Sequence, residues 1–368
     1  MSARHPTRPQ RHATTIATIA TIATALGPAF MPNAANKPDT ASAISFVPPS
    51  AMTLPRYAGV ASFMRAPHLA LSDAALSEVD IAMVGVPWDG GTTNRPGARH
   101  GPRQLRDLST MIRPKHPVTS QNPFEDRNIA DLGDAPVNPA DIMDTLESVT
   151  GFIAKLKSKG ITPLSAGGDH LLSYPILKAL ASDGPLGMVH FDAHTDLFDS
   201  YFNGFKYTHG TPFRRAIEDG YLDPRRVVQI GIRGTMYDGE DVEWGLAQGV
   251  RIIRMEEVID RGIDDVMAEA RDIVGHDKTY VSFDIDSVDP AFAPGTGTPE
   301  IGGFTSREAQ KMIRLLAGLN LVGADLVEVS PPFDPSGGTA WLGISLMYEL
   351  LCVLAGSNAT RNPNRKSG

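Results

Sequence analysis

The chain has 368 residues, 42% hydrophobic and 21% charged, which is typical of a folded globular protein and not of a disordered one. Its 42 acidic and 34 basic side chains give a net charge of −8, which argues against nucleic-acid or membrane-surface partners, because both require a basic surface. The single cysteine, Cys352, excludes an intrachain disulfide and fits a cytoplasmic protein, and no uncharged apolar run reaches the roughly 18–20 residues of a transmembrane helix.

Residues 1–50 differ in composition from the rest of the chain. Three arginines near the start precede Ala13–Leu26, a segment in which isoleucine recurs every third residue among alanines and threonines. A positive start followed by an apolar segment is typical of a secretory signal, but the threonines leave this segment only weakly apolar. We therefore expect a disordered or low-complexity tail over residues 1–50, one folded domain over residues 54–356 and a C-terminal tail over residues 357–368.

Short runs rich in valine and isoleucine alternate with helical segments along the expected domain. The runs that predict strands are Val79–Val86, Gly160–Ala166, Leu186–Phe191, Arg226–Ile232, Val250–Arg254, Thr279–Phe283 and Gly323–Val329. Helices are predicted over Leu171–Ala181 and from a capping box at residues 305–308 to about Gly318. Apolar strands between helices are typical of a parallel sheet covered on both faces, so we predict an α/β domain with a mostly parallel central sheet.

Acidic and imidazole side chains gather where four of these strands end. The segments are residues 167–170 (GGDH), 190–196 (HFDAHTD), 282–286 (SFDID) and 327–331 (VEVSP). Because the carboxyl ends of strands in an open parallel sheet meet at one crevice, where ligands bind, we expect the four segments to form one site.

The expected site holds more negative charge than a protein interior tolerates without cations. Its candidate ligands are Asp192, Asp196, Asp284, Asp286, His170 and His194. Four carboxylates in one pocket repel one another, which either raises their pKa values or requires bound cations. Two divalent ions would balance the four charges, and donors that are mostly oxygen suit Mn²⁺, with Ni²⁺, Co²⁺ or Fe²⁺ as alternatives.

Several motifs resemble those of the ureohydrolases, the arginase–agmatinase family. They are GGDH (167–170), DAHTD (192–196), SFDIDSVDPAFAPGTGTPEIGG (282–303) and VEVSPPFD (327–334). The resemblance implies a three-layer α/β/α fold, a binuclear manganese-type centre and hydrolysis of a guanidino C–N bond with release of urea. It also implies a homotrimer or homohexamer, with or without a homologous second subunit, and makes residues 54–356 the catalytic domain.

The resemblance also implies a role for each site residue. One ion would be held by His170, Asp192, Asp196 and Asp284, and the other by Asp192, His194, Asp284 and Asp286. A metal-bound hydroxide would then attack the guanidinium carbon. His209 lies where the family carries a proton shuttle, a role that suits imidazole, and Glu328 would pair with the substrate guanidinium through parallel N–H bonds.

The substrate is less sharply defined by these motifs. Phe198 occupies the position at which arginases carry an asparagine that holds the substrate α-carboxylate, which disfavours an α-amino acid. Phe198, Tyr201, Phe202 and, if it reaches the pocket, Trp341 would form an aromatic rim that favours methylated or delocalised cations. We rank a small guanidine or a guanidino acid such as 3-guanidinopropionate first, agmatine second, and an alkylated guanidine or biguanide such as metformin third.

Two further interpretations belong to other functional classes. The chain could be an inactive metal-binding subunit that supports an active homologue, although all six ligands, His209 and Glu328 are present. It could also be a deacetylase-like hydrolase, since that family shares the fold, although two histidines and six ligands for two ions favour a ureohydrolase. Release of urea by the purified chain would separate these classes.

Overall fold

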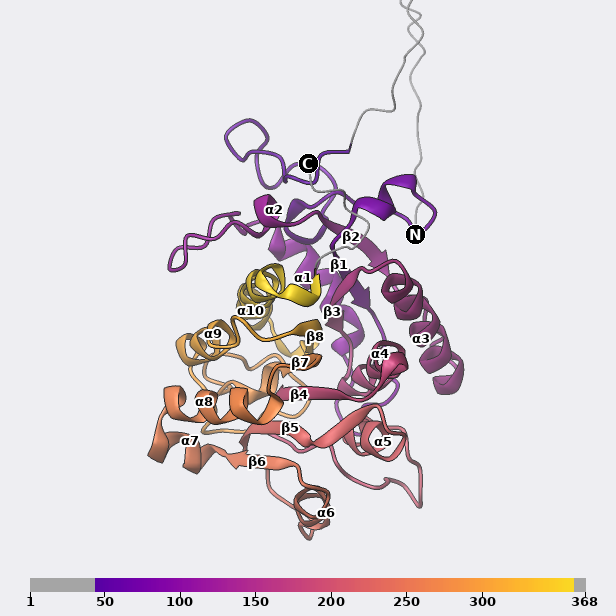
Figure 1. The fold of residues 1–368 in the computed structure, drawn as a ribbon, viewed down its shortest axis with the longest axis vertical. Helices are drawn as coiled ribbons and strands as arrows, with labels where there is room; N and C mark the ends of the chain where they lie inside the picture. Colours follow the sequence, from indigo (N-terminus) through magenta and orange to yellow (C-terminus); the bar gives the residue numbers. More distant parts are fainter. Residues whose placement is uncertain (1–43, 361–368) are drawn as a thin grey trace, which may run out of the picture. The chain divides into compact units, whose positions relative to one another are not determined.

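A single parallel sheet organises the part of the chain that this computed structural model describes, residues 44–360 (Figure 1). Its strands are β1 (Ile81–Val86), β2 (Ile129–Asp134), β3 (Thr162–Gly167), β4 (Leu186–Phe191), β5 (Leu222–Ile232), β6 (Arg251–Arg254), β7 (Thr279–Asp284) and β8 (Leu321–Val327). They lie in the order β2-β1-β3-β8-β7-β4-β5-β6, and every neighbouring pair is parallel. The mostly parallel sheet predicted from the sequence is therefore confirmed.

All seven predicted strands are present, with ends that shift by a few residues. β4 has the predicted bounds, β5 begins four residues earlier at Leu222, and β8 ends at Val327 instead of Val329. The strand that the sequence analysis missed is β2, whose sequence IADLGD is interrupted by acidic residues. Asp131 within it is fully buried and pairs with the Arg106 guanidinium at 2.8 Å, so its charge hides a strand that is otherwise apolar.

Helices cover both faces of the sheet and make three layers (Figure 1). One face packs against α3 (Ile142–Ser158), α4 (Ser173–Leu180), α5 (Pro212–Glu218) and part of α6 (Glu240–Gln248). The other packs against α1 (Gly101–Ser109), α2 (Pro123–Asp126), α7 (Met255–Arg261), α8 (Ile263–Val274), α9 (Ser306–Arg314) and α10 (Gly338–Gly356). The strands are thus buried on both faces, which explains their continuous apolar sequences.

Two helix predictions are refined by the structure. The capping box is present at the start of α9, where the Thr305 side chain accepts from the Glu308 backbone and Glu308 reaches back to Thr305. This helix ends at Arg314, and the chain then turns to Gly318, whose φ of 89° ends the element. The helix predicted over Leu171–Ala181 is α4 flanked by a 3₁₀ turn at each end.

Helix α10 is nineteen residues long and has one charged side chain, Glu349. Within residues 44–360 it is the helix that satisfies the length and hydropathy of a membrane span, with a mean hydropathy of 1.5 over its most apolar window. Of that window, 78% is buried inside the protein, and Glu349 pairs there with Arg314 and His116. Burial against the sheet accounts for its composition.

The expected tails lie largely outside the described residues. Residues 1–43 of the expected N-terminal tail and residues 361–368 of the C-terminal tail are not described. The boundaries proposed for the domain at residues 54 and 356 stay predictions.

Candidate metal centre

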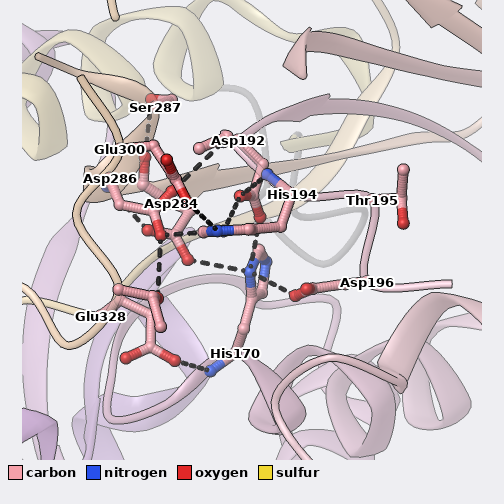
Figure 2. A network of polar contacts seen from close by, with 12 residues as sticks. His170, Asp192, His194, Thr195, Asp196, Asp284, Asp286, Ser287, Glu300 and Glu328 are labelled. Carbon is pink, nitrogen blue, oxygen red and sulfur yellow. Dashed lines mark hydrogen bonds and ion pairs between the residues drawn. The ribbon is translucent and has the colours of Figure 1, made fainter. Parts of the chain in front are cut away.

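The six predicted metal ligands come together at the carboxyl ends of neighbouring strands (Figure 2). His170 follows β3, Asp192, His194 and Asp196 follow β4, and Asp284 and Asp286 come at the end of β7. β8 lies between β3 and β7 and is followed by Glu328. These four strands are consecutive in the centre of the sheet, so the convergence expected from the sequence is present in the structure.

Three carboxylates converge on one imidazole nitrogen. His170 Nδ1 lies 3.0 Å from Asp192 Oδ2, 3.0 Å from Asp196 Oδ2 and 3.1 Å from Asp284 Oδ2, and Figure 2 shows the three groups turned toward the ring. All of these side chains are at most 9% exposed. A single N–H could donate to only one of the three oxygens, so the arrangement leaves at least two carboxylates without a donor here.

The other nitrogen of His170 shows which way the ring is protonated. The Ser282 hydroxyl donates to Asp325 at 2.7 Å, so it accepts at 2.8 Å from Nε2–H of His170. With its proton on Nε2, neutral His170 aims the lone pair of Nδ1 at the three carboxylates, and this buried nitrogen has no hydrogen-bond partner. A lone pair facing carboxylate oxygens is repulsive unless a cation lies between them, so the residues fit a metal ion.

His194 forms the second half of the cluster. Its Nδ1 lies 3.4 Å from Asp192 Oδ1 and 3.2 Å from Asp286 Oδ2, and its Nε2 lies 3.7 Å from Glu300 Oε1. Asp192 therefore offers one oxygen to each histidine, as expected of a carboxylate that bridges two ions. The division of the six residues into two ligand sets stays a prediction.

No lysine or arginine in residues 44–360 forms an ion pair with the four aspartates of the cluster. Burial raises the pKa of Asp284 well above its usual value, and the neighbouring charges of Asp286 and Asp192 add to this effect. Burial also acts to raise the pKa of Asp192, but the neighbouring imidazoles, that of His190 foremost, hold it well below the usual range. Imidazoles, backbone N–H groups and the Thr298 hydroxyl thus supply the compensation within residues 44–360, and without metal cations it is incomplete.

Two site residues have left-handed backbone conformations that side chains rarely adopt. Asp196 has a φ of 52° and Glu328 a φ of 63°. Such conformations cost roughly 1–3 kcal/mol and cluster at functional sites. At Glu328 this backbone brings the side chain back over the site, where Oε1 accepts from the His170 backbone N–H at 3.0 Å.

Glu328 and His209 contact each other beside the metal cluster. His209 Nδ1 lies 3.1 Å from Glu328 Oε1, and Nε2 lies 2.9 Å from the Thr93 hydroxyl. Burial opposes a charge on the imidazole, but its hydrogen bond to Glu328 raises the pKa of His209 to about 9. Both side chains line the same cavity as Asp196 and Asp284. The structure therefore places both predicted residues beside the cluster, while their roles stay predictions.

A cavity of about 560 Å³ opens in front of the cluster. Phe198 and Tyr201 line it, as the sequence predicts, and so does Tyr237. The Phe198 ring meets those of Tyr201 and Tyr237 edge-on, at centroid distances of 5.3 and 5.9 Å. Phe202 and Trp341 are not among the lining residues, so the expected aromatic rim is wrong at these two positions.

Sequence reasoning missed several residues of the site. His190 lies within β4 and donates from Nε2 to Asp192 at 2.8 Å, because Gln229 donates to its other nitrogen. Arg233 and Tyr237 come after β5, and Arg254 ends β6. The rule that strand ends line the crevice could have indicated these three, although β5 and β6 end in no acidic motif. Arg95, which also lines the cavity, precedes α1 and carried no comparable signal.

Comparison with known proteins agrees with this geometry. The model of the arginase family matches residues 79–352. The chain is 56% identical over 312 residues to guanidinopropionase of Pseudomonas aeruginosa, across 85% of this chain and 97% of the relative. It is 48% identical over 304 residues to guanidinobutyrase of the same organism, across 82% and 95%. Proclavaminate amidino hydrolase from Streptomyces clavuligerus has a similar structure, with a TM-score of 0.78, 38% identity and coverage of 83% and 100%. The chain belongs to the arginase family, whose metal-dependent ureohydrolases have this three-layer α/β/α fold and a binuclear metal centre.

Proposed function

We propose that this chain hydrolyses a guanidino acid to urea and an amino acid. The observation that carries the proposal is the cluster of four buried aspartates and two histidines without a lysine or arginine partner, at the bottom of a cavity that Glu328 also lines. The similarity to a guanidinopropionase and a guanidinobutyrase supports a substrate that bears a carboxylate two or three methylene groups from the guanidinium.

Two bound divalent ions would lower the pKa of a water molecule and so activate it for attack on the guanidinium carbon. The ligands would be the six residues of the cluster, and their oxygen-rich composition favours Mn²⁺ over Ni²⁺. We also propose that the enzyme is a cytoplasmic homotrimer or homohexamer, following the resemblance of its motifs.

Glu328 is held in place to receive the substrate. Its Oε1 accepts from the backbone N–H of His170 and lies against His209 Nδ1, so Oε2 is left for the guanidinium. A carboxylate whose first oxygen is already fixed can orient a planar guanidinium without losing further side-chain entropy.

His209 is placed to donate a proton to the leaving nitrogen. With a pKa of about 9 the imidazole favours its protonated form near neutral pH, and its Nδ1–H points toward Glu328. Addition of water to the guanidinium and transfer of both protons of that water, one after the other, to the leaving nitrogen give urea and an ammonium product, so atoms and charge balance. The aromatic wall of Phe198, Tyr201 and Tyr237 would shield this step from bulk water.

The substrate carboxylate would meet arginine side chains at the cavity wall. Arg95 and Arg254 line the cavity, and within residues 44–360 neither side chain makes an ion pair. Arg95 lies over the Phe333 ring, 3.9 Å from its centroid. Phe198 offers no donor to an α-carboxylate, so burying one against it would leave a charge unpaired.

Agmatine is the second candidate, and one observation favours it. Asp241 is 3% exposed and lines the cavity, and its Oδ1 has no hydrogen-bond partner, while Oδ2 accepts from Thr195. A carboxylate oxygen without a partner, in a residue that lines the cavity, suits the ammonium tail of agmatine. Asp241→Asn should lower kcat/KM for agmatine and leave that for 3-guanidinopropionate unchanged.

The test is a panel of guanidino compounds given to Mn²⁺- and Ni²⁺-loaded protein, with urea measured. We expect 3-guanidinopropionate or 4-guanidinobutyrate to give the highest kcat/KM, and L-arginine to be at least roughly 100-fold lower, equivalent to about 2.7 kcal/mol of transition-state binding. Highest activity on agmatine or metformin would overturn the substrate class. Two bound ions without urea from any compound would favour the inactive-subunit interpretation.

A loop substitution tests the role of Phe198 directly. Phe198→Asn should shift preference toward substrates with an α-carboxylate, because the amide supplies the missing donor. The matched control is Phe202→Asn, four residues later at a position that is 68% exposed and outside the cavity lining. Equal shifts in both variants would show that the loop, and not the Phe198 ring, controls specificity.

A further inference from the structure

Arg233 lines the catalytic cavity and is the arginine with the closest ties to the metal cluster, yet its guanidinium is fully occupied by the protein itself. It follows β5 and donates five hydrogen bonds, all to backbone carbonyls. Nε donates to Ile301 at 3.1 Å, Nη1 to Gly231 at 3.3 Å and Ser287 at 3.1 Å, and Nη2 to Asp286 at 2.7 Å and Glu300 at 2.6 Å.

Arginine has five N–H groups, so this set of acceptors uses all of them. A substrate carboxylate could bind Arg233 only by displacing one of these carbonyls from its donor, at the cost of that hydrogen bond. The position in the cavity suggests a substrate ligand, but the hydrogen-bond inventory contradicts that role.

The carbonyls that Arg233 holds belong to the residues around His194. Nη2 alone binds the carbonyls of Asp286 and Glu300, and the side chains of these two residues lie against the two nitrogens of His194 (Figure 2). The Arg233 backbone N–H also donates to Ala193 at 2.9 Å, in the segment before His194. The side chain of Arg233 thus ties together the end of β5, the segment after β7 and the loop at residues 300–301, and its backbone N–H adds the segment after β4.

Glycines make room for this arrangement. A Cβ atom at Gly303 would lie 2.4 Å from Arg233 Nη2 and 2.7 Å from the Ser287 carbonyl. A Cβ atom at Gly234 would lie 2.8 Å from His194 Cδ2. Side chains at either position would push the guanidinium or the imidazole out of place, so the local sequence is compatible with a tightly fixed His194.

We propose that Arg233 is a positioning residue for the half of the metal centre that contains His194 and Asp286. His194 needs such support because it is the most exposed of the six ligands, with 25% of its side chain accessible, whereas His170 is 1% exposed. The inference rests on the proposed metal centre and extends it: the two ions should depend unequally on Arg233. Outer residues that orient ligands commonly change metal affinity by 10–100-fold.

The experiment measures Mn²⁺ binding to the full chain by equilibrium dialysis and metal analysis, for the unmutated protein, Arg233→Met and Arg233→Lys. We expect two ions in the unmutated protein. In Arg233→Met one ion should bind at least about 10-fold more weakly, while the other changes less than about threefold. The Mn²⁺ affinity of Arg233→Lys should lie between those of the unmutated protein and Arg233→Met, because an ammonium has three donors and cannot reach five acceptors.

The matched control is Arg226→Met. Arg226 lies in β5 and likewise donates to backbone carbonyls, those of Val274 and Lys278, which lie outside the site. It should lower thermal stability and leave both ions bound. If Arg233→Met fails to fold, Arg233→Lys decides the question.

A second readout separates a positioning role from a substrate-binding role. At saturating Mn²⁺, the KM values of 3-guanidinopropionate and of an alkyl guanidine without a carboxylate should change by the same factor in Arg233→Lys. A KM increase confined to the carboxylate-bearing substrate would overturn the proposal. Unchanged Mn²⁺ binding in Arg233→Met would also overturn it. So would unchanged Mn²⁺ binding in Arg233→Lys when Arg233→Met has lost Mn²⁺ affinity. Failure of the unmutated protein to bind Mn²⁺ would instead reject the metal centre itself.

Discussion

The metal cluster and the ion-pair cluster formed by α7, α8 and the start of β6 (the α7–α8 cluster) both gather carboxylates, but only the second pairs each carboxylate with a guanidinium. In the α7–α8 cluster, Arg251 pairs with Glu257 and Glu269, and Arg261 pairs with Glu257, Glu269 and Asp265, with N–O distances of 2.5 to 2.6 Å for most pairs. Every acid there contacts a guanidinium. Within residues 44–360 the four aspartates of the metal cluster have histidines as ion-pair partners and no lysine or arginine.

Burial makes this difference more telling. The side chains of the α7–α8 cluster are mostly about 30% exposed, so water already screens their charges. The aspartates of the metal cluster are at most 9% exposed, where an uncompensated charge is most costly. A protein that pairs each carboxylate of one cluster with a guanidinium leaves the buried carboxylates of the other without such a partner, which indicates a site made for cations.

The largest effect expected from this comparison is on catalysis. Asp284→Asn removes a proposed bridging carboxylate, so it should reduce the metal content and abolish turnover. Metal analysis and urea release from the same preparation check this outcome. Two ions per chain together with full activity would show that Asp284 is not a ligand. Asp265→Asn, in the α7–α8 cluster, is the control and should change neither quantity.

The next largest effect concerns the proton shuttle. His209→Ala should keep both ions, because His209 touches Glu328 and Thr93 and none of the six proposed ligands. Its kcat should fall by about 10²–10⁴-fold, as expected when a general acid is removed. Turnover equal to that of the unmutated protein between pH 7 and 9 would exclude the role.

The comparison also predicts that the effect of Asp284→Asn on the free energy of unfolding has opposite signs without and with bound metal. Without ions, Asp284→Asn should stabilise the protein by roughly 1–3 kcal/mol, because it removes a buried charge beside Asp286 and Asp192. With Mn²⁺ the order should reverse, because ligand binding then stabilises the unmutated protein. Calorimetry in chelator and in Mn²⁺ measures both. A melting temperature in chelator below that of the unmutated protein would contradict the reading of the cluster as electrostatically strained.

The smallest effect is an acid dependence in the α7–α8 cluster. Hydrogen bonds from Arg251 lower the pKa of Glu257, with a further contribution from Arg261. A carboxyl whose pKa is lower in the folded state stabilises the fold above its unfolded pKa of about 4.3, and this stabilisation is lost as the pH falls through the folded value.

Glu257→Gln should therefore cost less than about 1 kcal/mol near pH 7, since the pair is exposed, and the difference from the unmutated protein should shrink below about pH 4. Urea denaturation at several pH values measures this change. Glu78→Gln, at an exposed position without a partner cation in residues 44–360, is the control and should show no such pH dependence. A difference that persists unchanged into acid would contradict the assignment.

The residues of the metal cluster could be predicted from the sequence because the signal for each of them lies within a few neighbouring residues. Each acidic motif directly follows an apolar strand, and the parallel sheet brings the strand ends together whatever the order of the strands. The histidine tautomer was not predictable, because it depends on Ser282 and Asp325, whose alignment comes from the pairing of β7 with β8.

The features that the sequence did not reveal depend on distant partners. β2 went unnoticed because the charge of Asp131 is neutralised by Arg106 from α1. The role of Arg233 depends on carbonyls of residues 231, 286, 287, 300 and 301, and every residue type has a carbonyl, so no side-chain pattern marks them. Phe202 was expected in the rim on sequence proximity alone, but it is 68% exposed.

The position of β8 has a consequence for how the protein is made. β8 is the last strand of the described sheet to be synthesised, yet it lies between β3 and β7 at the centre. β3 ends at Gly167, so it emerges about 150 residues before β8 begins at Leu321. At roughly 5–20 residues per second, an edge of β3 waits about 8–30 seconds on the ribosome for its neighbour.

During that interval the nascent chain exposes two open strand edges, those of β3 and β7. Open edges of apolar strands pair readily with other chains, and contacts between distant segments are slow to form. α10, the most apolar helix, emerges after β8 and covers the sheet from one face. Completion of the sheet, insertion of Glu328 into the site and burial of α10 therefore all await the synthesis of residues 321–356. Chaperones that bind apolar segments should stay bound to this chain until then.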